Sequence, residues 1–158
     1  ATKANRQQTR LKMYTTPEGK VNCQLIKVRP ITDERGSLCY VEAHKEIPFP
    51  IQRIFWIYDV KPGAQRGGHA HLTCAEAVFP LCGSFDIDID DGTHHRTFTL
   101  TAPDEGIIVN PGVWCVLHDF SPGTVCMVAA SKEYDPDGYI NDYNRFLELM
   151  HRKQKPND

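Results

Sequence analysis

The sequence contains no Cys-x-x-Cys pair, no long apolar run and no excess of charge of one sign. Without paired cysteines at that spacing, a zinc knuckle is not expected. No apolar stretch approaches the roughly 20 residues that are needed to cross a bilayer. The 18 Lys and Arg residues are balanced by 20 Asp and Glu residues, a formal net charge of −2, so nothing indicates a surface for nucleic acid. We therefore expect a protein that has neither a membrane nor a nucleic acid as its partner.

Two further features concern the compartment. The segment from Ala1 to Lys12 is polar and basic, and it has no apolar core of the kind found in a secretory signal. The six cysteines lie at irregular intervals, mostly inside apolar, strand-like stretches where a free cysteine behaves as a small hydrophobic residue. We expect these thiols to be reduced and the protein to be cytoplasmic.

The size and composition suit one compact domain. The chain has 158 residues, of which 41% are hydrophobic and 24% charged, so a packed core can form. We expect a flexible N-terminal segment over residues 1–20, a single domain over residues 21–151 and a loose tail over residues 152–158.

From residue 21 onward, short β-favouring runs alternate with turn residues, and no helical pattern separates them. The run from Phe85 to Ile89 alternates apolar and acidic residues, which predicts a strand that keeps its aspartates in solvent. The dipeptide Asp91-Gly92 then predicts a hairpin. This pattern is typical of an antiparallel sandwich or barrel. The expected strands cover residues 21–28, 37–42, 51–60, 76–81, 85–89, 95–100, 107–109, 114–120 and 125–131.

The last part of the chain has a different period. Ile140, Tyr143, Leu147 and Met150 recur at helical spacing. A short C-terminal helix packed against the sheet is therefore expected.

The most informative segment runs from Gly63 to Gly83 and contains His69, His71 and Glu76. Two histidines at positions i and i+2 of a strand point to the same face, so both imidazoles can reach one point. The spacing of the glycines, histidines and glutamate resembles the first motif of the cupin barrels, and the segment 106–115 resembles the second. The resemblance implies an all-β fold, a cupin jelly-roll barrel with a short C-terminal helix.

Many cupins hold a metal through three histidines and one glutamate. In this chain, His69, His71 and Glu76 would be the ligands of any metal, but Cys115 stands where relatives have the last histidine. The change breaks the nitrogen and oxygen set that suits iron or manganese, although zinc accepts thiolate. A metal-dependent cupin enzyme is therefore kept as an alternative.

Several segments resemble the nucleotide-sugar 3,4-ketoisomerases, also called the WxcM-like C-terminal family. These enzymes act on TDP-4-keto-6-deoxyglucose and its relatives in deoxysugar biosynthesis. The resemblance implies an isomerase that needs no metal or other cofactor, binds a TDP-linked keto-deoxysugar and forms a homodimer. The matching segments are residues 53–59, 66–71, 89–92, 111–114, 118–121 and 139–143.

The resemblance assigns acid–base catalysis to His69 and His71 jointly, without deciding which of the two works at carbon. Histidine suits this chemistry because its ordinary pKa, about 6.5, lets it accept and donate protons near neutral pH. Arg66 is expected to contact the diphosphate or the developing oxyanion. Arg53 is expected either to bind phosphate or to form an ion pair.

The remaining candidates for substrate binding are three aromatic residues, His118 and Cys115. The aromatic residues Trp56, Tyr58 and Trp114 would line the barrel mouth and stack on the substrate; for Trp56 and Trp114, a place in the core is the alternative. His118 would be a pocket group or a structural hydrogen-bonding residue, and Cys115 would contact the substrate. Because Cys115 and Leu72 depart from the family pattern, a non-catalytic sugar-nucleotide-binding cupin is a further alternative.

Overall fold

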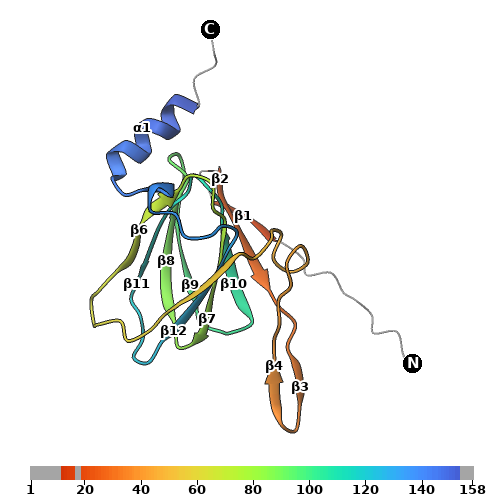
Figure 1. Ribbon diagram of the computed structural model, residues 1–158. Helices are drawn as coiled ribbons and strands as arrows, with labels where there is room; N and C mark the ends of the chain where they lie inside the picture. Colours follow the sequence, from red (N-terminus) through yellow and green to blue (C-terminus); the bar gives the residue numbers. More distant parts are fainter. Residues whose placement is uncertain (1–11, 17–18, 154–158) are drawn as a thin grey trace.

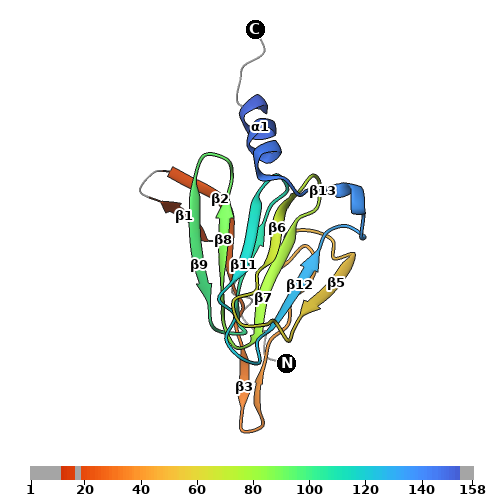
Figure 2. The same ribbon diagram turned by 90° about the vertical axis from the view of Figure 1, so that its left-hand side faces the viewer.

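The computed structural model describes residues 12–16 and 19–153, and it contains two antiparallel β-sheets that face each other (Figures 1 and 2). The six-stranded sheet has the order β1-β2-β10-β7-β12-β5, and the five-stranded sheet has the order β13-β6-β11-β8-β9. The expected jelly-roll barrel with a short C-terminal helix is confirmed. The elements are β1 (Lys12–Thr16), β2 (Gly19–Lys27), β3 (Ile31–Asp33), β4 (Gly36–Leu38), β5 (Arg53–Ile57), β6 (Arg66–His71), β7 (Glu76–Cys82), β8 (Phe85–Asp90), β9 (His95–Leu100), β10 (Glu105–Val109), β11 (Trp114–His118), β12 (Val125–Ala130), a 3₁₀ turn (Pro136–Gly138), β13 (Tyr139–Ile140) and α1 (Tyr143–Lys153).

The main core lies between the two sheets and follows from the alternation of residues along each strand. In β8, Phe85, Ile87 and Ile89 are buried, while the aspartates between them point outward. Full burial of each such side chain stabilises the fold by about 1.5–3 kcal/mol. The predicted wet face of this strand is confirmed.

The predicted hairpin at Asp91-Gly92 joins β8 to β9, and it also supports the helix. The Asp91 carboxylate accepts hydrogen bonds from the backbone N–H groups of Thr93 and His94. Gly92 has a φ of 89°, and a Cβ there would lie 2.8 Å from the Cβ of Met150. Glycine therefore satisfies both the left-handed turn and the close approach of α1.

Helix α1 stands at one end of the barrel, next to β6 and β13, and extends away from it (Figure 1). Phe146 is fully buried against Ala70 and Ile140, and the Tyr143 hydroxyl donates a hydrogen bond to Asp90. The predicted helix is confirmed, with one correction: Ile140 lies in β13, where it pairs with Ala70, because the chain turns at residues 141–142 before the helix begins.

The outer face of the six-stranded sheet is covered by the segment between β4 and β5. Its residues Ile47 and Phe49 pack with Phe79, Ile108 and other side chains of the sheet. The strand expected over residues 37–42 is wrong beyond Leu38, because the chain leaves the β3–β4 hairpin there to cross the sheet. That hairpin projects from the barrel at the end away from α1 (Figure 1).

The segment expected to be flexible, residues 1–20, contains a paired strand. Strand β1 pairs with β2 in an antiparallel register that runs from Lys12 opposite Leu25 to Thr16 opposite Gly19. Residues 1–11 and 17–18 lie outside the described part of the chain, as do residues 154–158 of the expected tail, while Arg152 and Lys153 belong to α1. The expected domain limits of 21 and 151 stay a prediction. Among the described residues, no helix is long and apolar enough to span a membrane.

Candidate active site

Strands β6 and β7 place His69, His71 and Glu76 inside the barrel. His69 and His71 alternate with Ala70, which faces outward and packs against α1. A bulge between β6 and β11 sets the register that pairs His69 with Cys115. Gly67 makes this bulge possible: its φ is 80°, and a Cβ there would lie 2.8 Å from the carbonyl oxygen of Cys115. The two histidines thus share the inner face of β6, as positions i and i+2 of a strand do, and the bulge at the glycines sets how this strand meets β11.

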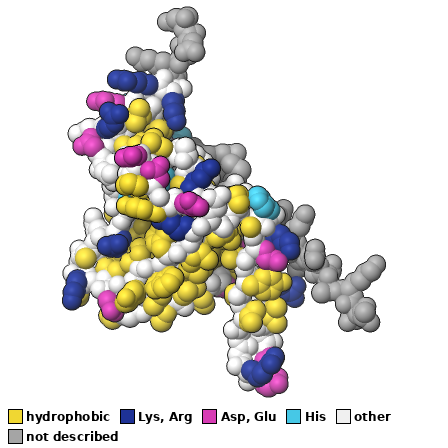
Figure 3. All heavy atoms as spheres, viewed as in Figure 1, with side chains coloured by type: hydrophobic (Ala, Val, Ile, Leu, Met, Phe, Trp, Pro, Cys, Tyr) yellow, Lys and Arg dark blue, Asp and Glu magenta, His cyan; other side chains and the backbone are white. Residues whose placement is uncertain are grey.

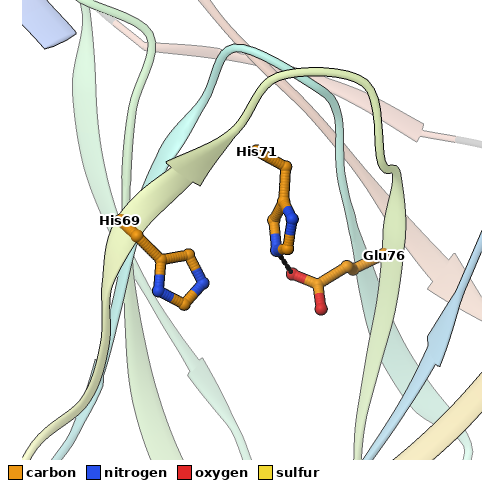
Figure 4. Close-up of side chains that lie close together, drawn as sticks. All are labelled: His69, His71 and Glu76. Atoms are coloured by element: carbon orange, nitrogen blue, oxygen red, sulfur yellow. Dashed lines mark ion pairs between the residues drawn. The ribbon is translucent and has the colours of Figure 1, made fainter. Parts of the chain in front are cut away.

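The three side chains point toward one another (Figure 4). The rings of His69 and His71 have centroids 5.0 Å apart and stand nearly perpendicular. Nε2 of His71 lies 2.8 Å from Oε1 of Glu76, and both side chains are about nine-tenths buried. The distance is that of an ion pair, but the approach lies outside hydrogen-bond geometry, so Nε2 is otherwise a buried nitrogen without a partner.

A tyrosine that the sequence analysis left without a role completes this group. Strand β13 pairs with β6 so that Tyr139 lies opposite His71. The Tyr139 ring centroid is 4.6 Å from that of His71 and 4.9 Å from that of His69. The segment from Tyr139 to Tyr143 carries part of the resemblance to the ketoisomerases, which is the one sequence signal that pointed to this residue.

Burial controls the protonation of two groups in the barrel. Burial lowers the pKa of His69, the nearby His71 lowers it further, and Glu76 opposes both effects. Burial also raises the pKa of the Cys115 thiol well above its ordinary value, and the charge of Glu76 adds to this effect. Cys115 is therefore a neutral thiol near pH 7, which makes it a weak hydrogen-bond donor rather than a base.

The same three residues are the candidate metal ligands. The ligand atoms of His69, His71 and Glu76 all lie within 4.8 Å of one another. Two imidazoles and a carboxylate are a donor set that suits a divalent transition metal. Among the described residues, the group whose ligand atoms converge does not include Cys115.

A cleft of about 300 Å³ opens beside this group, with His71 and Tyr139 in its wall. Two cationic side chains, Arg53 and Lys132, and the exposed Tyr134 ring also line it. The Arg53 guanidinium lies over the rings of Phe55 and Tyr134, and its Nε donates to the carbonyl of Lys132. The acidic residues Glu133 and Asp135 line the cleft as well, so its outer part carries charges of both signs beside the buried acid–base group. Arg53 and Lys132 are the groups in this lining that can bind an anion.

Of the seven predicted substrate-binding residues, Arg53 lines this cleft, and six do not: Trp56, Tyr58, Trp114, Arg66, Cys115 and His118. Trp56 of β5 and Tyr58, which directly follows it, are 62% and 61% exposed and alternate with the half-buried Phe55 and Ile57. Trp114 points outward from β11 and packs against Tyr143 and Phe146 of the helix region. Arg66 is exposed at the start of β6. Trp114 thus packs against the helix, and its role in substrate binding stays a prediction.

His118 also lies outside the barrel. It alternates with the inward Leu117 on β11, and its ring is held between Asp88 and Asp119 at 2.9 Å from each. The hydrogen bond with Asp88 raises the pKa of His118, partial burial opposes the rise, and the contact with Asp119 adds to it. His118 thus has the structural role that the sequence analysis left open.

A jelly-roll barrel that carries paired histidines and a glutamate on its inner face defines a protein of the cupin type. Residues 21–151 match the family model described as FdtA, WxcM-like, C-terminal, and the chain belongs to this family.

The chain is similar to three proteins with known names. It is 42% identical over 127 residues, 80% of this chain and 91% of the relative, to TDP-4-oxo-6-deoxy-alpha-D-glucose-3,4-oxoisomerase of Aneurinibacillus thermoaerophilus. The crystal structure of a 3,4-ketoisomerase from Helicobacter canadensis matches 83% of this chain and 98% of its own at 35% identity and a TM-score of 0.81. QdtA, a sugar 3,4-ketoisomerase from Thermoanaerobacterium thermosaccharolyticum, was solved with TDP; it covers 85% of this chain and 98% of its own at 31% identity and a TM-score of 0.81. A histidine-to-asparagine mutant of QdtA was solved with TDP-4-keto-6-deoxyglucose.

Proposed function

We propose that this protein is an isomerase that moves the keto group of a TDP-linked 6-deoxyhexose between carbons 4 and 3. The observation that carries the proposal is the buried pair His69 and His71, which adjoins a cleft lined by Arg53 and Lys132. The family and the names of its similar members support the substrate class.

The reaction needs proton transfer only. A base removes the proton from carbon 3, and the electron pair of that C–H bond forms the enediol as the carbonyl oxygen at carbon 4 takes up a proton. Carbon 4 then receives a proton, and the hydroxyl at carbon 3 loses its own to become the new ketone. His69 and His71 supply two groups that can accept and donate protons near pH 7. No oxidant or reductant is consumed, because the sugar is oxidised at one carbon and reduced at the next.

The cleft suggests how the substrate lies. With the sugar against His71 and Tyr139, the diphosphate reaches Arg53 and Lys132, which carry the positive charges of a lining that also contains Glu133 and Asp135. Arg53 is the better diphosphate partner because its planar guanidinium donates two hydrogen bonds at once. The exposed ring of Tyr134 offers a stacking surface for the base.

The test is incubation with TDP-4-keto-6-deoxyglucose in D₂O, followed by NMR. We expect deuterium at carbon 3 and the signals of a 3-keto product. Thermal stabilisation by TDP without exchange or product at high enzyme concentration would instead identify a sugar-nucleotide-binding protein.

A metal-dependent reaction is the second candidate, since His69, His71 and Glu76 bring three donor atoms within 4.8 Å. Elemental analysis of protein purified without chelators separates the two proposals. Iron, zinc or manganese in a 1:1 ratio, together with loss of isomerisation after chelation, would favour the metal-dependent enzyme.

We also propose a cytoplasmic homodimer. All six cysteines are free thiols, including the exposed Cys39 and Cys82, as expected in a reducing compartment. Hydrophobic side chains gather on the barrel face seen in Figure 3 and on the hairpin that projects from it. Large exposed apolar side chains lie in or next to the β3–β4 hairpin and the edge strand β5. They are Ile31, Leu38, Tyr40, Ile54, Trp56 and Tyr58. A second copy would cover this face and the open edge of β5. Light scattering at several protein concentrations tests the dimer.

A further inference from the structure

Glu76 begins β7, and its carboxylate lies inside the barrel with an exposed fraction of about one-tenth. Within residues 21–153, His71 is the only basic side chain at ion-pair distance from it. A buried carboxylate is strongly unfavourable unless a proton donor faces it. Among the described residues, the His71 ring is the group placed to supply that proton.

The contact involves one particular nitrogen of the ring. Nε2 of His71 is the buried nitrogen 2.8 Å from Oε1 of Glu76, and no other described residue pairs with it. At this distance, a small rotation of either side chain brings the N–H onto the oxygen. In a neutral imidazole, a proton on Nε2 leaves the lone pair on Nδ1. The carboxylate therefore selects one of the two tautomers.

Aromatic neighbours restrict the same ring. Tyr139 packs on His71 at 4.6 Å with an angle of 47° between the planes, and His69 meets it edge-on at 5.0 Å. A ring flip would direct a carbon at Glu76, so packing and pairing favour one orientation. His69 has no carboxylate within ion-pair distance among the described residues.

We propose that Glu76 is a positioning residue that keeps a proton on Nε2 of His71 and so makes Nδ1 the nitrogen that exchanges protons with the substrate. The inference rests on the proposed ketoisomerase function. When Nδ1 takes a proton from the sugar, the C–H electron pair enters the enediol and His71 becomes an imidazolium that faces a carboxylate. Glu76 stabilises that charged state, and the proton returns to the sugar in the second half of the reaction.

The first test does not depend on activity. ¹⁵N-labelled histidine side chains, observed by two-dimensional NMR in the full chain at a pH where the His71 ring is neutral, should show His71 protonated at Nε2 in the wild type. A mixture of tautomers is expected in Glu76→Leu, which removes the acceptor. A wild-type His71 protonated at Nδ1 would overturn the proposal, even if the enzyme proves inactive.

The second test is kinetic. We expect Glu76→Leu to lower kcat by about 10²-fold with a KM within about threefold of the wild type, because Glu76 acts through His71 and not on the bound sugar. Glu76→Gln keeps the shape of the side chain without its charge, so its kcat should lie between those of the wild type and Glu76→Leu. Glu76→Asp should restore part of the lost kcat. The surface variant Glu105→Gln, which removes an exposed pair with Lys27, is the matched control. If Glu76→Leu does not fold, Glu76→Gln carries the test, and an unchanged kcat in it would contradict the proposal. Absence of turnover in the wild type would reject the ketoisomerase function and leave the tautomer measurement to judge Glu76.

Discussion

Two adjacent glycines allow a direct test of how the bulge in β6 positions the histidines. Gly67 and Gly68 have nearly the same left-handed φ, 80° and 76°. An alanine at either position therefore incurs the same backbone strain, about 1–2 kcal/mol. The surroundings differ: a Cβ on Gly67 would lie 2.8 Å from the carbonyl oxygen of Cys115, whereas a Cβ on Gly68 has nothing within 4 Å.

The expected difference follows from that contact. An ordinary Cβ contact begins at 3.4 Å, so Gly67→Ala must separate β6 from β11 by about 0.6 Å, at a cost of about 1–3 kcal/mol beyond the shared strain. For a chain of this size, 1 kcal/mol corresponds to roughly 2–4 °C in Tm. Gly68→Ala should therefore lower Tm by roughly 2–8 °C, and Gly67→Ala by roughly 4–20 °C.

The activity should separate the two variants further. Cys115 pairs directly with His69, and a misplacement of about 1 Å can reduce a rate by about 10²-fold. We expect Gly67→Ala to lose about tenfold or more in kcat for the 3,4-isomerisation, while Gly68→Ala keeps a value near the wild type. Equal losses in Tm and kcat for the two variants would refute the reasoning, since backbone strain would then account for everything.

The other predictions concern single side chains. His71→Asn and His69→Asn should each lower kcat by about 10²-fold or more while TDP still raises Tm, as measured by NMR turnover and thermal denaturation; near wild-type turnover would remove them from the mechanism. Arg53→Ala should raise the Kd for TDP about tenfold or more, because charge-assisted hydrogen bonds to the diphosphate are lost, whereas Arg29→Ala, outside the cleft lining, should leave it unchanged. The pKa of His118 is higher in the folded state than in the unfolded state, so protonation of His118 stabilises the fold. This stabilisation is complete below the unfolded pKa and is lost as pH rises through the folded pKa. His118→Gln should therefore lower Tm more at pH 5.5 than at pH 9, and His95→Gln should not; an equal loss at both values would contradict the sign.

The sequence predicts this fold well where the local pattern has one reading. The alternation of apolar and acidic residues in β8 is compatible only with a strand, and Asp91-Gly92 only with a tight turn. The structure contains both. The two histidines were identified for the same reason, because positions i and i+2 of any strand share a face.

The sequence predictions are wrong or incomplete where a local pattern is compatible with two structures, or where segments far apart in the sequence come into contact. Both faces of β5 and of the residue that follows it carry large apolar side chains. The sequence pattern therefore does not reveal that Phe55 and Ile57 point inward while Trp56 and Tyr58 point outward. Tyr139 reaches the histidines only because the chain returns to pair with β6, 68 positions after His71. Neither composition nor spacing encodes that pairing.

The wall of the cleft comes from three stretches that are far apart along the chain, residues 52–53, 71–74 and 132–139. Its last part is made only after the barrel strands that precede it have been synthesised. The histidine pair therefore stays open to water until residues 132–139 dock, and catalytic competence should be acquired late during folding. Weakening the two-residue pairing of β13 with β6 should then abolish turnover while the rest of the barrel remains native.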